Sequence, residues 1–320
     1  MSIEIIISSC FNVVTVVKFL FIASLNERRT LQLPKNIKLA KHSGFCYGVK
    51  RAVETVKKLK AQNPDKDVFI LGELIHNTHV IKELEDLGIK TITEIPQKGS
   101  GICVVRSHGA SPEIFEQIVS AGFELFDLTC PDVKKVQQKA IQLVQKGYFL
   151  IIVGKAEHPE VIAIKASAQR FGSDIFVASD ISQLKEIEQE IKTHEKVGVV
   201  VQTTQRITTL NSIVEYLETI SKELMVANTI CASTNLRQNE ARELASETDL
   251  MIVVGSRKSA NTTHLAEILN DITKTIHIED DQELYNYKDV ILDANNIAIT
   301  AGASTPENII KNVINKLKGG

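Results

Sequence analysis

The chain has 320 residues, of which 43% are hydrophobic and 24% charged, and its formal net charge is −2. These values are typical of a globular protein with two or three domains. The charges are balanced, no basic run occurs and Trp is absent, which argues against a nucleic-acid partner. Five cysteines are too few, and odd in number, for a disulfide framework, so we expect a reducing cytoplasmic location.

The first 36 residues form a segment with its own composition. Residues 3–25 are apolar and rich in β-branched side chains, but Glu4, Asn12 and Lys18 interrupt them. A membrane helix needs about 20 nearly uncharged apolar residues, and a signal peptide carries positive charge before its apolar run. Because the segment fits neither pattern, we predict that residues 1–36 are an N-terminal extension outside the core, without a membrane partner.

From residue 37 onward, short apolar strands alternate with amphipathic helices, which favours an α/β fold with mainly parallel sheets. The same order of a strand, a cysteine, a helix and a strand occurs three times. The cysteines are Cys46, Cys130 and Cys231. The strands before them lie at 37–41, 123–128 and 224–227, and the strands after the helices lie at 68–71, 148–153 and 250–254.

Each repeat also contains a later apolar strand that ends in polar or small residues. These strands lead to His108, Thr203 and Ser304. A repeat of this length indicates similar domains, each large enough to bury its own sheet. We therefore predict three similar α/β domains around a pseudo-threefold axis, at residues 37–122, 123–222 and 223–320.

The three cysteines occupy equivalent places in this repeat. Ligands of open parallel sheets bind outside the carboxyl ends of the strands, so three such domains would bring Cys46, Cys130 and Cys231 to one centre. A single free cysteine is most often core filler, but three equivalent ones predict a metal site. Zinc is one candidate, although structural zinc sites usually use close Cys-x₂₋₄-Cys pairs, which are absent here. A four-iron cluster is the other, and three protein ligands would leave one iron open to a substrate oxygen.

Polar residues at the other strand ends predict an anion site beside this centre. Histidines occur there at His76, His108 and His158, and Ser259, Asn261 and Ser304 add hydroxyl and amide groups. Backbone N–H groups at the starts of helices also favour anions. We therefore expect a phosphate or diphosphate ligand, with imidazolium groups supplying much of the positive charge.

Glu160 follows His158 by two residues and has two interpretations. It is a negative charge in the first turn of a helix, which the helix dipole favours. It is equally placed to donate a proton to a leaving hydroxyl at the edge of the pocket. The sequence pattern leaves both open.

Several motifs together closely resemble the LytB/IspH family, the 4-hydroxy-3-methylbut-2-enyl diphosphate reductases. The resemblance covers about residues 37–318. Its motifs include Gly44-Phe-Cys-Tyr-Gly-Val-Lys-Arg-Ala, Ile75-His-Asn, Ser107-His-Gly, Asp127-Leu-Thr-Cys-Pro, Gly154-Lys-Ala-Glu-His-Pro-Glu-Val, Gln202-Thr-Thr, Ile230-Cys with Thr234 and Arg237-Gln, Gly255-Ser-Arg-Lys-Ser-Ala-Asn and Thr300-Ala-Gly-Ala-Ser.

The resemblance implies a reductive dehydroxylation that gives isopentenyl and dimethylallyl diphosphate, the last step of the non-mevalonate pathway. It implies a [4Fe-4S] cluster on the three cysteines, with one iron open to the substrate alkoxide, and ferredoxin or flavodoxin as electron donor. It assigns the diphosphate to His76, His108, Ser259, Asn261 and Ser304. It places His158 and Thr203 at the hydroxyl end of the substrate and makes Glu160 the proton donor.

Some residues depart from this pattern. Ala260 stands where many relatives have a second serine, which removes one side-chain donor. Cys10 and Cys103 match no ligand motif, and Cys103 lies inside an apolar strand, which predicts core filler. The remaining histidines that we expect to be structural or exposed are His79, His194, His264 and His277.

Other classes of protein make different demands on the sequence. A dinucleotide-binding module needs G-x-G-x-x-G after its first strand, and Gly44 to Gly48 does not have that spacing. A zinc hydrolase or a structural zinc protein remains an alternative, as does a non-enzymatic iron–sulfur sensor of the same fold. A sensor, however, has no need of a diphosphate pocket.

Overall fold

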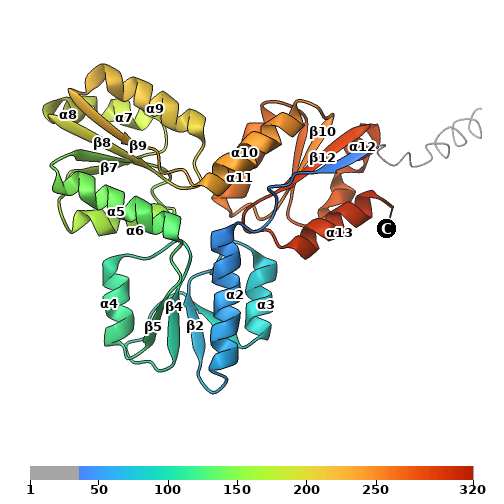
Figure 1. Cartoon of the computed structure of the whole chain (residues 1–320), viewed down its shortest axis with the longest axis horizontal. Helices are drawn as coiled ribbons and strands as arrows, with labels where there is room; N and C mark the ends of the chain where they lie inside the picture. The colour runs from blue at the N-terminus through green and yellow to red at the C-terminus, as the bar shows by residue number, and fades with distance from the viewer. Residues whose placement is uncertain (1–35, 320) are drawn as a thin grey trace, which may run out of the picture.

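The computed structural model describes residues 36–319, which form three α/β units around a common centre (Figure 1). The predicted extension lies outside the described residues except for Asn36, which begins a strand. Among residues 36–319, no helix is long and apolar enough to cross a membrane.

The helices and strands follow the same order in each unit. The first unit contains α2 (Tyr47–Gln62), β2 (Val68–Leu71), α3 (Thr78–Asp86), β3 (Ile89–Ile92), β4 (Ile102–Val105), α4 (Pro112–Ser120) and β5 (Glu124–Asp127). The second contains α5 (Pro131–Gln145), β6 (Phe149–Val153), α6 (Pro159–Gln169), β7 (Ile175–Ala178), α7 (Ile181–Glu186), α8 (Glu188–Thr193), β8 (Lys196–Val201), α9 (Ile207–Ile220) and β9 (Glu223–Ala227). The third contains α10 (Ala232–Ala245), β10 (Leu250–Val254), α11 (Ala260–Asn270), β11 (Thr275–Ile278), the 3₁₀ helix η1 (Asp281–Tyr287), α12 (Lys288–Asp293), β12 (Asn296–Ala301) and α13 (Glu307–Leu317), together with β1 (Asn36–Leu39).

Each unit is built on a four-stranded sheet with one shared topology. The strand orders are β3-β2-β4-β5, β7-β6-β8-β9 and β11-β10-β12-β1. All neighbouring strands of the three sheets are parallel. This confirms the predicted α/β class and the threefold repeat.

The strand before each cysteine joins a different sheet from the one we predicted. β1 pairs with β12 of the third unit, β5 with β4 of the first, and β9 with β8 of the second. The expectation that these strands open the sheets of their own units is therefore wrong. An apolar pattern specifies that a strand is buried but not which sheet it joins. By sheet membership, we propose unit boundaries close to the three cysteines rather than at residues 37, 123 and 223.

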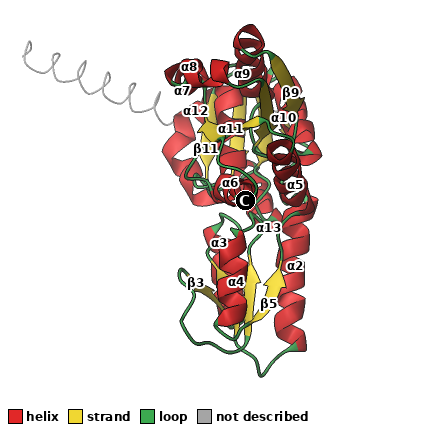
Figure 2. Cartoon of the chain, turned by 90° about the vertical axis from the view of Figure 1, so that its left-hand side faces the viewer, coloured by secondary structure: helices red, strands yellow, loops and turns green. Residues whose placement is uncertain are grey.

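Helices cover both faces of each sheet, as the first unit illustrates. Alternate residues of its strands face opposite sides, so Ile70 and Val104 pack beneath α2 and α3. Cys103 and Val105 face α4 on the other side (Figure 1). Cys103 is fully buried there, which confirms its prediction as core. Figure 2 shows the strands of this unit between their covering helices.

Candidate active site

Each of the three predicted cysteine ligands is the N-cap of a helix that points at the centre of the molecule. Cys46 caps α2, Cys130 caps α5 and Cys231 caps α10. The N-terminus of a helix carries partial positive charge, which favours thiolate over thiol. The first helix of every unit therefore directs its positive end toward a shared cluster of sulfur atoms.

A hydrogen bond across the unit boundary fixes each cysteine backbone. Each cysteine N–H donates to a carbonyl in the loop that follows the central strand of the preceding sheet. The pairs are Cys46 with Ala303 at 3.2 Å, Cys130 with Ser107 at 2.9 Å and Cys231 with Thr203 at 3.0 Å. The site is thus assembled at the contacts between units, and each unit supplies one cysteine and one supporting loop.

These hydrogen bonds also correct the predicted equivalence of the strand-end residues. Thr203 corresponds to Ser107 and Ala303, because all three accept the equivalent bond. His108 and Ser304 therefore lie one position further along, where the second unit has Thr204. A one-residue offset in loops cannot be read from a single sequence, because no regular period extends through a loop. Thr203 and Thr204 nevertheless both border the central pocket.

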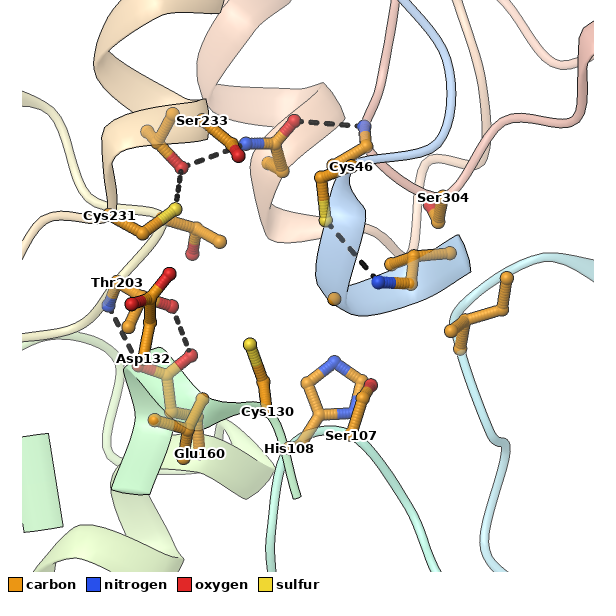
Figure 3. Close-up of a pocket in the computed structure, with 18 of the residues that line it drawn as sticks. Cys46, Ser107, His108, Cys130, Asp132, Glu160, Thr203, Cys231, Ser233 and Ser304 are labelled. Atoms are coloured by element: carbon orange, nitrogen blue, oxygen red, sulfur yellow. Dashed lines mark hydrogen bonds between the residues drawn. The ribbon is translucent and has the colours of Figure 1, made fainter. Parts of the chain in front are cut away.

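All of the predicted site residues border one central pocket (Figure 3). They are Cys46, Cys130, Cys231, His76, His108, His158, Glu160, Thr203, Ser259, Asn261 and Ser304. We call the part lined by the cysteines the cysteine end and the part lined by the histidines the histidine end. The sequence prediction of a single shared site for these residues is consistent with this arrangement.

Gly48 leaves room for the sulfur atoms. A Cβ atom at this position would lie 2.7 Å from Cys130 Sγ and 4.0 Å from Cys46 Sγ. The first distance is shorter than any ordinary contact, so a side chain at Gly48 would displace the sulfur. At the third corner, Cys231 Sγ lies 3.1 Å from Thr234 Oγ1. All three cysteines are free thiols.

The spread of the sulfurs bears on the two predicted kinds of metal centre. One zinc ion binds sulfur at about 2.3 Å in a tetrahedron, which puts the sulfurs about 3.8 Å apart. Among the described residues, only the three histidines form a group of potential ligands within 4.8 Å of one another. The three cysteine sulfurs do not all lie within this distance of one another, which is a wider spread than one tetrahedral zinc ion requires.

The three histidines form a compact cluster opposite the cysteines. The ring of His108 lies 4.7 Å from that of His76 and 5.5 Å from that of His158, between centroids. His158 Nδ1 accepts a hydrogen bond from Glu160 N at 3.2 Å, so its neutral ring carries the proton on Nε2. His76 Nδ1 lies 2.9 Å from a carboxylate oxygen of Glu73. His108 Nδ1 is buried and has no hydrogen-bond partner among residues 36–319.

The electrostatics of the cluster show which charge state the histidines have in the free pocket. Burial lowers the pKa of His108 well below its ordinary value, and the neighbouring histidines and Arg106 lower it further. Burial, His76 and Arg106 lower the pKa of His158 to about 4. At neutral pH these two rings are therefore neutral before an anion binds. They offer N–H donors rather than charge.

The environment of Glu160 is compatible with both of the interpretations that the sequence left open. It lies in the first turn of α6 and is only 1% exposed. Thr203 donates to its carboxylate twice, from N to Oε1 and from Oγ1 to Oε2, each at 2.7 Å. Burial raises the pKa of Glu160 to about 7, against the opposing effect of these hydrogen bonds. A carboxyl with this pKa can hold and release a proton near neutral pH.

The third unit supplies hydroxyl, amide and backbone donors. Ser259 caps α11, and Ala260 begins that helix at the edge of the pocket. The first N–H groups of a helix have no partner within the helix, so the backbone here can replace the hydroxyl that Ala260 lacks. Asn261 Oδ1 accepts from Ala303 N at 3.1 Å, and Ser304 Oγ donates to the His76 carbonyl at 3.4 Å.

Sequence reasoning missed three residues that border the cysteine end of the pocket, namely Tyr47, Asp132 and Ser233. Tyr47 donates a hydrogen bond to Asp132 Oδ2 at 2.7 Å and thereby joins the first turns of α2 and α5. Each of the three lies one or two residues after a cysteine. Their position in the first turn of a cysteine-capped helix was the signal that could have identified them.

The remaining predicted structural histidines lie outside the pocket. His264 Nδ1 is hydrogen-bonded to the Thr204 carbonyl at 2.8 Å, and His277 Nε2 to the Gly255 carbonyl at 2.8 Å. His194 stacks on Phe149. His79 faces Asp280 at 3.7 Å. Cys10 lies outside the described residues.

Comparisons with known proteins give one consistent result. A family model described as LytB protein matches residues 37–318. The 4-hydroxy-3-methylbut-2-enyl diphosphate reductase of Syntrophotalea carbinolica is 39% identical over 87% of this chain and 97% of its own. The corresponding reductase of Geobacter sulfurreducens is 39% identical over 88% of this chain and 96% of its own.

Two solved structures have the same fold. One is an (E)-4-hydroxy-3-methyl-but-2-enyl diphosphate reductase, described as the terminal enzyme of the non-mevalonate pathway, with a TM-score of 0.65 and 35% identity. The match covers 89% of this chain and 99% of that one. The other is the E-1-hydroxy-2-methyl-but-2-enyl-4-diphosphate reductase of Plasmodium falciparum, with a TM-score of 0.80 and 26% identity. It covers 88% of this chain and 87% of that one.

Proposed function

The chain belongs to the LytB family, and from this premise we propose that it reduces 4-hydroxy-3-methylbut-2-enyl diphosphate. The allylic C–O bond breaks, two electrons and two protons are consumed, and the hydroxyl leaves as water. The products are isopentenyl and dimethylallyl diphosphate, at the end of the non-mevalonate pathway. The observation that carries the proposal is that three helix-capping cysteines share one pocket with three histidines and the buried Glu160.

The cysteines Cys46, Cys130 and Cys231 would hold a [4Fe-4S] cluster with one iron open to the substrate. When bound, the cluster supplies the electrons and a Lewis-acid position beside the histidines. The sulfurs do not all lie within 4.8 Å of one another, which favours such a group over a single ion. The absence of a side chain at Gly48 and the three converging helix N-termini would suit any metal centre held by these cysteines.

The histidine end of the pocket would bind the diphosphate. His76 and His108 supply imidazole N–H donors, and Ser259, Asn261 and Ser304 supply hydroxyl and amide donors from the third unit. Because burial keeps the His108 ring neutral in the free protein, binding would begin with hydrogen bonds. The negative charge of the ligand would then favour protonation of the rings.

Glu160 would provide the proton for the leaving hydroxyl. Its two hydrogen bonds from Thr203 fix the direction of the carboxyl group. Its raised pKa of about 7 means that a large fraction is protonated at neutral pH. His158 packs beside it with its Nε2–H free to orient the hydroxyl, since its Nδ1 already accepts from Glu160 N. These two residues and Thr203 thus serve the reacting end of the substrate.

Ferredoxin or flavodoxin would deliver the electrons in the cytoplasm. A non-enzymatic iron–sulfur sensor would use the same cysteines, but it gives no reason for a buried acid with a pKa near 7 or for a cluster of histidines. The enzyme is therefore the better interpretation of this pocket.

Anaerobic purification followed by a turnover assay tests the proposal. We expect a brown protein with broad visible absorption and about four irons per chain. With a chemical reductant it should convert the allylic diphosphate into both products, detected by mass spectrometry. A colourless, zinc-loaded protein under the same anaerobic conditions, or an iron-loaded protein that leaves the substrate unchanged, would contradict it.

A further inference from the structure

Arg237 is a buried cation between the cysteine end of the pocket and the third sheet. It lies on α10 behind Cys231 and is 4% exposed. Its Nη1 donates to the carbonyls of His42 and Ala301, each at 2.5 Å, and its Nη2 donates to the Gly44 carbonyl at 2.8 Å. The side chain therefore ties the turn that leads into Cys46 to the end of β12.

These contacts satisfy hydrogen bonds but leave the positive charge without a counter-ion. Carbonyl groups carry no net charge, and no carboxylate among the described residues forms an ion pair with Arg237. Glu240 lies one turn further along α10. Its carboxylate already accepts hydrogen bonds from the backbone N–H groups of Lys41 and His42 and contacts the His42 ring. The Nε atom of Arg237 is also buried, and it has no hydrogen-bond partner among residues 36–319. A buried unpaired cation is costly, so its presence calls for a compensating negative group.

The groups that would become negative on binding a metal centre, Cys46 and Cys231, both adjoin the backbone that Arg237 holds or belongs to. Burial lowers the pKa of Arg237, and when ionised these two cysteines would oppose that effect more strongly than Glu240 does. Cys46 follows the turn that Arg237 holds, and Cys231 starts the helix that carries it. The cation is thus buried beside the segments that carry two of the three cysteines.

We propose that Arg237 is the built-in counter-charge of the cysteine centre, a positioning residue that stabilises the negative charge of the thiolates and of the reduced centre. This inference rests on the proposed iron–sulfur centre. A fixed positive charge in a poorly solvated position favours addition of an electron nearby, because charges are weakly screened there. It therefore predicts that Arg237 raises the reduction potential and retains the metal.

Arg51 provides a matched control. It lies on α2 and donates through Nη2 to the carbonyls of Leu128 and Thr129, just before Cys130, at 3.2 and 2.8 Å. Its relation to the Cys130 turn resembles that of Arg237 to the Cys46 turn, but Arg51 is exposed. Water screens its charge, so its removal should affect the hydrogen bonds more than the potential.

The test compares Arg237→Gln, Arg237→Lys and Arg51→Gln in the anaerobically purified, iron-loaded protein. The midpoint potential is measured by redox titration followed by electron paramagnetic resonance, and iron loss is measured as its rate of transfer to a chelator. We expect Arg237→Gln to shift the potential downward by the equivalent of a tenfold change in the one-electron equilibrium, 59 mV. It should also release iron several-fold faster. Arg237→Lys keeps the charge and should restore most of the potential, and Arg51→Gln should change it little.

Three results would overturn the inference. They are an unchanged potential in iron-loaded Arg237→Gln, equal shifts in Arg237→Gln and Arg237→Lys, or an equal shift in Arg51→Gln. Equal shifts in the two Arg237 variants would mean that the hydrogen bonds from the guanidinium group to the three carbonyls set the potential and that the positive charge does not. If Arg237→Gln does not fold, the comparison of Arg237→Lys with the unchanged protein still decides, because a retained charge must retain the potential. A wild-type protein that holds no iron–sulfur centre would instead refute the proposed function itself.

Discussion

Thr203 directs both its backbone N–H and its hydroxyl at the carboxylate of Glu160, each at 2.7 Å. The two residues come from different helix–strand segments of the second unit, 43 positions apart. Without these bonds a carboxyl that is 1% exposed would be more difficult to ionise. The hydrogen bonds from Thr203 therefore limit the rise in the pKa of Glu160, which is about 7.

Replacement of this acid tests its role in turnover. Glu160→Gln keeps the shape and can still bond to Thr203, but it has no proton to give. We expect turnover to fall by about 10²–10⁴-fold, the usual contribution of a general acid, while iron content and the affinity for the diphosphate remain. Glu157→Gln is the control, because Glu157 lies in the loop just before α6 and is exposed. Turnover of Glu160→Gln equal to that of the control would refute the assignment.

The hydrogen bond from the Thr203 hydroxyl should be visible in the pH dependence. It stabilises the ionised carboxylate and so lowers the pKa of Glu160. Thr203→Val removes it, and we expect the alkaline limb of the rate profile to move to higher pH with reduced turnover. Thr203→Ser should restore the original limb. A limb that stays in place in Thr203→Val would show that another group controls it.

Glu160 also links stability to pH. Its folded pKa of about 7 lies above the ordinary value of 4.5, so the folded state holds the proton more tightly than the unfolded chain. Stability should therefore fall as pH rises from about 4.5 through 7, by about 3 kcal/mol for this group. Gln at this position does not ionise, so Glu160→Gln does not bear the cost of a buried carboxylate. It should unfold at a higher temperature than wild type at pH 8, and this difference in unfolding temperature should disappear below pH 4.5. Calorimetry of the metal-free proteins measures it, and an advantage independent of pH would contradict the linkage.

The neutral histidines predict that ligand binding takes up protons. The pKa values of His108 and His158 are lowered in the free pocket, and a bound diphosphate would raise them. Binding of inorganic pyrophosphate near pH 6 should therefore consume protons, which calorimetry detects as a heat that depends on the buffer. His108→Asn should reduce this uptake, whereas His194→Asn, which alters a ring stacked on Phe149, should not. Binding without proton uptake would mean that the rings act only as neutral donors.

Much of the site could be predicted from the sequence because its residues follow a repeated pattern. Cys46, Cys130 and Cys231 each come between a strand and a helix, and parallel sheets bring such positions to one edge. The residues that the pattern missed act across unit boundaries. The Tyr47–Asp132 bond joins two units, and nothing in either local sequence specifies the partner.

The parts that sequence reasoning got wrong depend on long-range partners. The alternation of apolar and polar residues in β1 indicates a strand, but its pairing with β12 joins Asn36 to Asn296, far away in the chain. The neutral state of the histidines in the free pocket could not be predicted for a similar reason. Burial and the proximity of one ring to another lower the pKa of His108, and neither quantity is present in a motif. The sequence therefore indicated which residues border the pocket, but not how deeply each is buried or which side chains surround it.

The absence of a side chain at Gly48 should be necessary for the pocket to hold the proposed metal centre. A Cβ atom there would lie 2.7 Å from Cys130 Sγ, and the backbone at Gly48 does not have positive φ. Gly48→Ala therefore leaves the backbone unstrained, favours the helix by up to about 1 kcal/mol and acts through the sulfur contact alone. We expect a folded protein with most of its iron and turnover lost.

The control for this variant is Lys50→Ala, an exposed change in the same turn of α2. Metal analysis and visible absorption after anaerobic reconstitution compare the two proteins, and circular dichroism checks that both are folded. Because Gly48 contacts the sulfur but supplies no ligand, loss of iron in Gly48→Ala would locate the centre between Cys46 and Cys130. Full iron content in Gly48→Ala would mean that the centre does not need the position of Cys130 Sγ, and the three-cysteine assignment would fail.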